Sequence, residues 1–508
     1  MDDQGGDRSA SPAGRNNRNS GLFRNTLSLA GTALAAVSLV NIIFLFVIDA
    51  FSRRPNPYVG IFAYMVMPAF LILGLLLIPA GMLLERHRRR KYGTADLPRF
   101  PRFDLNNPRQ RSTLVSVLVF VVVFVLLSAV GSYRAYEFTD SVQFCGQLCH
   151  TVMHPEFVAY SLSPHARVRC VDCHVGAGAS WYVRSKLSGV RQVYATAFHT
   201  YPRPIPTPVA NLRPAQQTCE ECHWPRKFYG DQFKVITHFG YDEKSTPAQV
   251  RLLIKTGGGD PLSGIPTGIH WHMNIGNEVT YAVTDPKRQK IDWVQVKNLD
   301  TGQITVYKAK DAAESDAQLA AAPKRRTDCI DCHNRPTHIY VPPDRAVDQS
   351  LLAGRLDPTM PFIKQQAVTA LTGDYPTTTA AQQGIGQTLR EFYGKYPAVQ
   401  AATVNNAIRE VQRIYSDTIF PEMKVDWRTH PDNIGHYYYP GCFRCHDGQH
   451  VSSTGKTVPN GCDVCHFIVG QESGTAQVNI AAHTFKHPGG ELPEGIKCMD
   501  CHTGGVGP

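Results

Sequence analysis

The residues with the clearest chemistry are fourteen cysteines that form seven closely spaced pairs, each followed directly by a histidine. Six pairs have the spacing CxxCH, and the first has CxxxCH. Two thiols at this spacing can form thioethers to a porphyrin, and the adjacent histidine then reaches the iron. The pattern therefore predicts seven covalently bound c-type haems. In chain order, motifs 1 to 7 are Cys145/Cys149/His150, Cys170/Cys173/His174, Cys219/Cys222/His223, Cys329/Cys332/His333, Cys442/Cys445/His446, Cys462/Cys465/His466 and Cys498/Cys501/His502.

Zinc sites, iron–sulfur clusters and structural disulfides also use pairs of cysteines. None of these sites requires a histidine after every pair. No cysteine of this chain lies outside the seven motifs. The haem interpretation is therefore favoured over all three alternatives.

A second axial ligand for each iron is sought among the other histidines. Of 20 histidines, seven belong to the motifs and His87 lies in a basic loop, which leaves twelve. Imidazole on both faces keeps iron low-spin and suits electron transfer, and no CxxCK motif marks a haem for substrate. The predicted iron ligands beyond the motif histidines are Met153, His165, His199, His270, His338, His436, His450 and His487.

Several ligand assignments stay open at this point. His270 and His272 flank Trp271 and would point the same way on a strand, so one of them could bind the fourth haem while the other packs. In the last part of the chain, more histidines than haems are available, and their pairing is not readable. These are His430, His436 and His450 around motif 5, and His483 and His487 before motif 7.

The elements that position these motifs begin with three uncharged, apolar stretches upstream of them, residues 25–48, 55–84 and 112–133. Each reaches the roughly 20 residues that a helix needs to cross the hydrocarbon layer. They predict three transmembrane helices. A cleaved signal peptide is the alternative for the first stretch, but that stretch is longer than an ordinary signal and no clear cleavage site follows it.

The net charge of +10 is concentrated in the same region, because residues 1–133 carry +8 of it. Nine cations lie within residues 85–112, whereas the loop between the first two stretches has only Arg53 and Arg54. Lysine and arginine stay on the cytoplasmic side of a membrane. We expect a multi-pass protein of the inner (cytoplasmic) membrane with a cytoplasmic N-terminus and periplasmic haem motifs, and no nucleic-acid partner.

The stretch from Cys145 to His174, with Tyr160 and His165, resembles the NapC/NirT family of membrane-anchored tetrahaem quinol dehydrogenases. The resemblance continues through Lys186–Tyr194 and motif 3 to the segment CIDCHNRPTH at 329–338, and covers about 113–340. With several membrane stretches and seven motifs, the chain is more similar still to the heptahaem inner-membrane cytochromes of metal-reducing bacteria, the ImcH type.

The resemblance implies particular ligands. It makes His165 the distal ligand of the motif 3 haem and His338 that of the motif 2 haem. In the family, a methionine two residues after the first motif histidine binds haem 1. Here Met153 comes three residues after His150, which leaves His150, Met153 and His154 in competition.

The resemblance also implies a quinol site beside haem 1, with Lys186, Arg191 and Gln192 as the candidate catalytic residues. They lie in segment 181–194, where cations alternate with apolar and aromatic residues. This pattern is also typical of a helix that anchors in lipid headgroups.

The expected fold class is mostly α, with irregular haem-packed cytochrome c regions, three transmembrane helices and a small β-meander insertion. Alternating polar and apolar residues predict the meander at 279–285, 290–298 and 302–310. The Ala-rich stretch 312–323 indicates a linker, and 365–414 two or three helices. The predicted domains are a cytoplasmic tail 1–24, a membrane domain 25–134, a tetrahaem domain 135–345 with an insertion 240–311, a helical connector 346–430 and a trihaem domain 431–508.

Together these features predict a quinol dehydrogenase that passes electrons from the membrane quinol pool through seven haems to periplasmic c-type cytochromes or a partner redox subunit. Two alternatives remain open. One is a conduit subunit in a larger membrane complex whose partner supplies the quinol chemistry. The other is a terminal reductase, which an open haem face in the C-terminal part would support.

Overall fold

The structure is a computed structural model, and it divides the chain into two compact units, Met1–Thr139 with Ala177–Val183, and Asp140–Gly176 with Arg184–Pro508. All seven motifs belong to the second unit. The predicted tail 1–24 lies outside the described residues. The structure describes residues 25–51, 67–92, 105–148, 150–176, 179–209, 212–224, 230–258, 268–273, 276–474, 476–478, 485–487, 490, 493 and 496–506.

The first unit contains three long helices, α1 (Thr26–Phe51), α3 (Met67–Tyr92) and α4 (Pro108–Thr139). In the described part of the chain, two helices are long and apolar enough to cross a membrane, over Thr26–Leu45 in α1 and Met67–Arg88 in α3. The structure therefore has two candidate spans, not the predicted three. The third predicted stretch, 112–133, is helical within α4, but several of its side chains lie outside the described residues.

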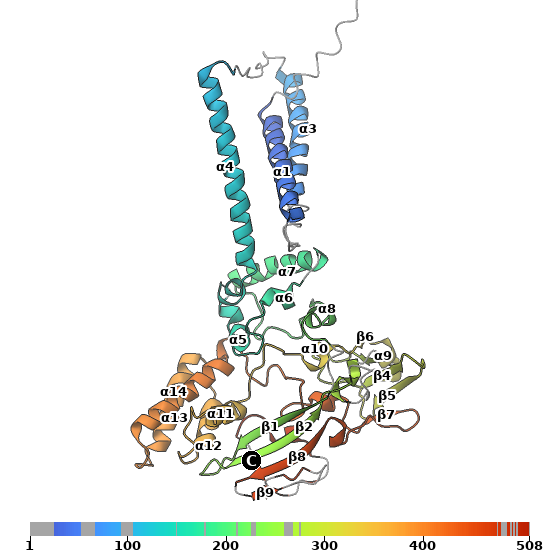
Figure 1. The fold of residues 1–508 in the computed structure, drawn as a ribbon, viewed down its shortest axis with the longest axis vertical. Helices are drawn as coiled ribbons and strands as arrows, with labels where there is room; N and C mark the ends of the chain where they lie inside the picture. The colour runs from blue at the N-terminus through green and yellow to red at the C-terminus, as the bar shows by residue number, and fades with distance from the viewer. Residues whose placement is uncertain are drawn as a thin grey trace, which may run out of the picture. The chain divides into compact units, whose positions relative to one another are not determined.

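Helices α1 and α3 lie side by side (Figure 1), and they are antiparallel, because Ser28 meets Ile78 while Ala35 meets Gly74. Small residues permit this close approach. A Cβ on Gly31 would lie 2.7 Å from the carbonyl oxygen of Gly74, and a Cβ on Gly74 would lie 2.7 Å from the backbone nitrogen of Ala35. Small residues at such contacts are typical of helix pairs in membranes.

The second unit is built from short helices, 3-10 turns and two antiparallel sheets, and α7 (Ala179–Ala197) runs across the boundary between the units. The remaining described helices are α5 (His150–Ser161), α6 (Cys170–His174), α8 (Gln216–Cys219), α9 (Asp316–Ala321), α10 (Cys329–Cys332), α11 (Pro343–Leu352), α12 (Ile363–Leu371), α13 (Thr378–Tyr393), α14 (Ala401–Thr418) and α15 (Cys498–Cys501). A π-turn η2 (Phe144–Leu148) and the 3-10 turns η4 (Ile269–Met273), η5 (Pro421–Met423), η6 (Gly441–Arg444) and η7 (Cys462–Val464) complete the helical elements described.

The predicted meander is confirmed as β3 (Asn277–Ala282), β4 (Trp293–Asn298) and β5 (Ile304–Ala309), which pair antiparallel in that order. It is larger than predicted. The strand β6 (Lys324–Arg326) pairs with β3, and β7 (His450–Ser452) pairs with β5, so the sheet order is β6-β3-β4-β5-β7. The last pairing joins the insertion to the chain just after motif 5.

A second sheet was not predicted. It has the order β1-β2-β8-β9, from β1 (Asp231–Phe239), β2 (Pro247–Lys255), β8 (His466–Ser473) and β9 (Ala476–Val478). Strand β8 begins at His466 of motif 6 and pairs with β2, which lies more than two hundred residues earlier. The insertion and the C-terminal part of the chain therefore share both sheets.

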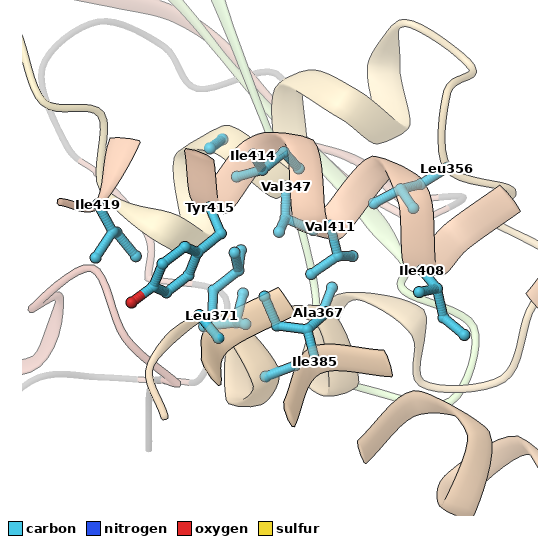
Figure 2. Packing of buried hydrophobic residues seen from close by; sticks show 14 of the residues in the cluster. Val347, Leu356, Ala367, Leu371, Ile385, Ile408, Val411, Ile414, Tyr415 and Ile419 are labelled. Atoms are coloured by element: carbon cyan, nitrogen blue, oxygen red, sulfur yellow. The ribbon is translucent and has the colours of Figure 1, made fainter. Parts of the chain in front are cut away.

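The predicted helices at 365–414 are confirmed as α12, α13 and α14, which pack with α11 around the largest hydrophobic core (Figure 2). Val347 of α11, Ile385 of α13 and Val411 of α14 are fully buried. On α14 the buried residues recur three and four positions apart, as an amphipathic helix requires. Val152 and Ala159 of α5 belong to the same core, so the helix that begins at His150 of motif 1 is attached to it.

The predicted linker at 312–323 is in part helical. Helix α9 begins after Ser315, whose hydroxyl accepts a hydrogen bond from the Gln318 amide while the Gln318 side chain returns to the Ser315 amide. Leu319 is buried beneath it. An alanine-rich stretch with a capping box forms a helix once one apolar side chain finds a core.

Candidate haem sites

Each described motif forms a single tight turn. In motifs 3, 4, 5 and 7, the amide of the motif histidine donates to the carbonyl of the first cysteine, at 2.7 to 3.0 Å. Three motifs, CVDC, CIDC and CMDC, carry an aspartate before the second cysteine, and its carboxylate accepts a hydrogen bond from the residue before the first cysteine. This aspartate caps the turn. A turn of this kind places two thiols three residues apart on one side.

Five motif histidines have a second histidine ring close by. Two imidazoles on opposite faces of one iron, each with a metal–nitrogen bond of about 2 Å, have ring centres about 6 Å apart. The observed separations match this spacing. The pairs are His174–His338 at 6.2 Å, His223–His165 at 6.0 Å, His446–His272 at 5.8 Å, His466–His436 at 6.2 Å and His502–His487 at 6.1 Å.

The tautomer of several of these rings is set by a backbone carbonyl. The Nδ1 atom lies within hydrogen-bond distance of a carbonyl oxygen in five histidines, and the bond leaves Nε2 for a metal. The carbonyl oxygens and distances are those of Pro336 for His165 (3.3 Å), Thr256 for His270 (2.5 Å), Ile269 for His272 (2.9 Å), Glu156 for His338 (3.0 Å) and Pro459 for His446 (2.6 Å).

Burial also favours the neutral imidazole, which is the form that binds a metal. Burial is the leading cause of a lowered pKa in seven of the paired or motif histidines. They are His174, His272, His333, His338, His436, His466 and His502.

His270 and His272 lie on the 3-10 turn η4 rather than on a strand. With three residues per turn, side chains two positions apart diverge, so the expectation that they point the same way is wrong. His272 meets His446 of motif 5. Burial lowers the pKa of His333 in motif 4, and the nearby charges of His270 and His223 lower it further. His270 therefore lies near motif 4. The ligands predicted from the sequence include His270 but not His272. The position of His272, two residues after His270 and on the other side of Trp271, was the feature that could have identified it.

Two predicted ligands lie away from the described motif histidines. His450 is 1% exposed, and both ring nitrogens are occupied, Nδ1 by Asp447 at 2.9 Å and Nε2 by the Ile291 carbonyl at 2.7 Å. This arrangement occupies both nitrogens without a motif histidine, and the role of His450 as a ligand stays a prediction. His199 is exposed, and its ring lies 6.3 Å from that of Tyr201.

Among the predicted attachment cysteines, Cys222 of motif 3 departs from the expectation of a packed haem region, because it is exposed. Cys332 and Cys462 are also exposed, whereas the other ten cysteines that the structure describes are partly buried. The physical reason at Cys222 is its place at the end of a short turn, next to exposed Glu221 and His223. An exposed thiol is accessible to a porphyrin, so haem attachment at Cys222 stays a prediction.

The region of motif 1 is described only in part. Cys149 and the side chain of His150 lie outside the described residues, as does His483. Met153 is half-buried against the helical core, and the His154 ring packs against Phe420 at 5.5 Å.

The predicted quinol-site residues all lie on α7. The side chain of Lys186 lies outside the described residues. Arg191 and Gln192 are exposed, and the Gln192 amide donates to the Ser188 hydroxyl at 3.2 Å.

Two further residues touch the motifs without having been predicted. Tyr437 stacks on the His502 ring at 4.5 Å, and its hydroxyl lies 3.0 Å from His502 Nδ1. Arg444, between the cysteines of motif 5, hydrogen-bonds to motif 4. Their positions near motif 5 were visible in the sequence, but their partners are distant in the chain.

The motifs follow one another through space in the order of the chain. A hydrogen bond with Cys145 of motif 1 lowers the pKa of Cys170 in motif 2 to about 7. Burial, with the nearby Cys219 of motif 3, raises the pKa of Cys173. A hydrogen bond with Cys329 of motif 4 lowers the pKa of Cys219. The first four motifs therefore form a continuous series.

The series continues through the last three motifs. Desolvation by the surrounding protein raises the pKa of Cys332 in motif 4 to about 11, although this residue is exposed. The nearby Cys442 of motif 5 contributes to the same rise. Burial and Cys442 likewise raise the pKa of Cys465 in motif 6 to about 11. Burial, with a smaller contribution from Cys462 of motif 6, raises the pKa of Cys498 in motif 7.

The donor set fits haem. The thirteen cysteines that the structure describes form no disulfides there, so their sulfur atoms can form thioethers. Among the described residues, no three His, Cys, Asp or Glu side chains gather as a metal-ion site. An iron already held by a porphyrin takes two axial ligands, and pairs of histidines supply them.

Residues 107–204 match the N-terminal region of the NapC/NirT cytochrome c family. Over 504 residues, the chain is 44% identical to the cytochrome c-type protein ImcH of Geobacter sulfurreducens, an alignment that covers 97% of this chain and 99% of the relative. No solved structure matches the chain significantly.

Proposed function

The chain belongs to the NapC/NirT-type multihaem cytochromes c that include ImcH, and from this premise we propose that it oxidises quinol at the membrane and relays the electrons through seven haems to periplasmic c-type cytochromes. The observation that carries the proposal is the proximity of consecutive motifs, where hydrogen bonds join the segment that begins at Ala215, just before motif 3, to Asp328 before motif 4, and join motif 4 to motif 5.

When bound, the haems supply one-electron redox centres. The chain's own residues hold them in place. The seven cysteine pairs would attach the porphyrins, and the motif histidines would bind one face of each iron. We assign the other face to His338 and His165 for motifs 2 and 3, His270 and His272 for motifs 4 and 5, and His436 and His487 for motifs 6 and 7.

Histidines on both faces support a relay rather than a terminal reductase. A substrate needs an open face on the iron, and the five close histidine pairs would close both faces. Motif 1 is the remaining place for donor chemistry, and it is the motif nearest in sequence to α4.

Quinol oxidation releases two electrons and two protons. We assign the binding of the quinol oxygens and the transfer of these protons to Lys186, Arg191 and Gln192 of α7, a segment that follows motif 2 within the region matched by the NapC/NirT family. Arg191 and Gln192 are exposed and therefore accessible to a membrane-borne substrate. The protons would leave on the periplasmic side.

The two apolar helices α1 and α3 support attachment to the inner membrane. Covalent haem attachment takes place outside the cytoplasm, which supports a periplasmic location for the second unit. The redox partners would then be the quinol pool on one side and soluble cytochromes on the other.

The decisive experiment mixes the purified, oxidised holoprotein anaerobically with a reduced menaquinol analogue and follows the haem α-band by stopped flow. Fast reduction is expected in the wild type, and its rate should fall by about tenfold or more in Lys186→Ala if this residue handles a quinol proton. Arg184→Ala is the matched control, because it removes a cation of the same helix that is not assigned to the site.

No reduction by quinol, in a preparation that dithionite reduces fully, would contradict quinol oxidation by this chain. The conduit interpretation would then hold, with a partner subunit as the electron donor. Equal slowing in Arg184→Ala and Lys186→Ala would instead assign α7 to lipid anchoring.

A further inference from the structure

Electrons that travel along the motif series must cross from motif 4 to motif 5, although more than one hundred residues separate these motifs in the chain. The intervening residues form the helical core of α11 to α14. Something other than chain connectivity must therefore hold the two attachment loops together.

Arg444 provides such a connection. It lies between the two cysteines of motif 5, and it is 9% exposed. Its guanidinium donates to three backbone carbonyls, those of Gly441 at 2.8 Å, Arg288 at 2.9 Å and Asp331 at 2.7 Å. Asp331 lies between the two cysteines of motif 4, so a single side chain connects the two attachment loops directly.

The carbonyl of Asp331 has a second donor in the Asn433 side-chain amide, at 3.1 Å. Asn433 is 3% exposed, and its backbone amide donates to Asn334 at 2.9 Å, just after motif 4. The chain before motif 5 is therefore also joined to the chain after motif 4.

The residues that accept these bonds make further contacts of their own. The Asp331 carboxylate accepts hydrogen bonds from the Tyr281 hydroxyl at 2.7 Å and from Arg325 Nε at 2.8 Å, both on the five-stranded sheet. Arg288, whose carbonyl accepts from Arg444, has a φ of 56°, which is unfavourable for a residue with a Cβ. Its own side chain also reaches Asp331, at 3.6 Å.

The charge of Arg444 acts on both motifs. The guanidinium belongs to motif 5 and lies 2.7 Å from the Asp331 carbonyl of motif 4, so its charge is adjacent to both attachment loops. A fixed positive charge between two redox centres stabilises the reduced, more negative form of each one.

We propose that Arg444 is a positioning residue that ties the attachment loop of motif 5 to that of motif 4, and so fixes the separation across which electrons pass from the first four haem sites to the last three. The inference rests on the proposed relay function. It adds the place where electrons would cross between two motifs that are distant in the chain and are joined by side-chain hydrogen bonds, chiefly those of Arg444.

The test compares Arg444→Met, which removes every donor, with Arg444→Lys, which retains the charge but not the three-way geometry. The control is Arg428→Met, which removes an arginine whose side chain is 70% exposed and pairs with Asp426. Each holoprotein is first analysed for covalent haem content. Freeze-quench EPR then follows the low-spin signals of individual haems after mixing with the quinol analogue.

Both Arg444 variants are expected to reduce the first four haems at the wild-type rate and the last three about tenfold more slowly or worse, as when a supporting hydrogen bond is lost. Arg444→Met should also lower the midpoint potentials of two haems, whereas Arg444→Lys should leave them near their wild-type values. Arg428→Met should match the wild type throughout. Wild-type kinetics in both Arg444 variants with complete haem content would overturn the proposal.

Two measurements separate this inference from the proposed function. Hydrogen exchange of the amides in 441–446 should be about tenfold faster in Arg444→Met, whatever the electron donor. If quinol reduces no haem even in the wild type, the proposed function fails, and exchange and potentiometry still decide the role of Arg444. If Arg444→Met does not mature with its full complement of haems, the same comparison is made with Arg444→Lys, and unchanged exchange and kinetics there overturn the proposal.

Discussion

At the scale of single residues, the histidines divide by what their two ring nitrogens contact. His272 directs Nδ1 to a carbonyl and lies beside a motif histidine, whereas His450 has both nitrogens occupied by Asp447 and the Ile291 carbonyl. The first arrangement prepares a ring for iron, and the second uses a ring to join β7 to the start of β4. Two histidines of similar appearance in the sequence therefore have different surroundings.

If motif 5 carries the haem proposed above, replacement of His272 by alanine is expected to convert that haem from low-spin to high-spin, because the iron loses its second imidazole. EPR of the oxidised holoprotein and binding of carbon monoxide to the reduced form measure this change. A low-spin spectrum without carbon monoxide binding would contradict the assignment of His272.

The matched variant His450→Ala should leave all haems low-spin. It should lower the free energy of unfolding by about 2 kcal/mol, because Asp447 and the Ile291 carbonyl would each lose a buried partner. A high-spin haem in this variant would show that His450 is a ligand after all.

Glu410 on α14 supports the helical core through charge. Burial alone would raise its pKa, but hydrogen bonds from Arg413, Ser350 and Arg355 prevail and hold the pKa at about 2, below the ordinary 4.5. A carboxylate with a depressed pKa contributes stability that is fully present above about pH 4.5 and is lost as the pH falls toward 2.

We therefore expect Glu410→Gln to be less stable than the wild type by about 2 kcal/mol near pH 7, and the difference to shrink as the pH falls from about 4.5 toward 2. Denaturant unfolding followed by far-ultraviolet circular dichroism measures it. Protonation of haem ligands at low pH affects the wild type and the variant equally, so it cancels in the difference between their free energies of unfolding. A difference that stays constant down to pH 2.5 would contradict the role given to Glu410.

At the scale of elements, most helices and strands form where local patterns indicate them, but the pairing of strands depends on distant chain. Strand β8 begins at His466 and pairs with β2, and β7 pairs with β5. Both pairings draw the segment that holds motifs 5 and 6 onto the insertion. The sheets thus help bring η4, with His270 and His272, to its motifs.

The pairing of α1 with α3 depends on glycine, so Gly74→Leu should separate the two helices. A Cβ there would lie 2.7 Å from the nitrogen of Ala35 and 2.8 Å from the carbonyl oxygen of Gly31. A loss of about 1 to 3 kcal/mol is expected from such overpacking, measured as thermal stability in detergent micelles. Gly131→Leu in α4 is the control and should have no effect, because among the described residues no atom outside its own helix backbone and chain neighbours lies within 4 Å of a Cβ at that position. Equal stability of both variants would contradict the packing.

At the scale of the whole molecule, the chain separates a membrane part from a haem-bearing unit that contains all seven motifs. The relay inferred here lies within that single unit. Its sheets join residues that the domain prediction assigned to different parts of the chain.

The orientation of the chain is a prediction at this scale. Reporter fusions should show the N-terminus in the cytoplasm and a site after Asp140 in the periplasm, since nine cations cluster within 85–112 and haem is attached outside. This outcome requires an odd number of crossings, whereas the described residues contain two candidate spans, in α1 and α3. If both reporters lie on the same side, only α1 and α3 cross, and the predicted orientation is wrong.

The sequence by itself determined the chemistry, because covalent haem attachment depends on local spacing. Seven Cys–His motifs, the apolar N-terminal segments, the meander and the three connector helices are all encoded by residues close together in the chain. The family resemblance followed from the same local motifs.

Tertiary structure alone decided which histidine meets which motif. His272 reaches motif 5, His450 bonds to Asp447 and Ile291 instead of facing a motif histidine, and Arg444 joins two motifs more than a hundred residues apart. A pattern of spacing specifies the turn in which a side chain sits, but not the surface that the turn will face. That surface is set by strand pairings and buried hydrogen bonds between distant segments, which form only when the whole unit folds.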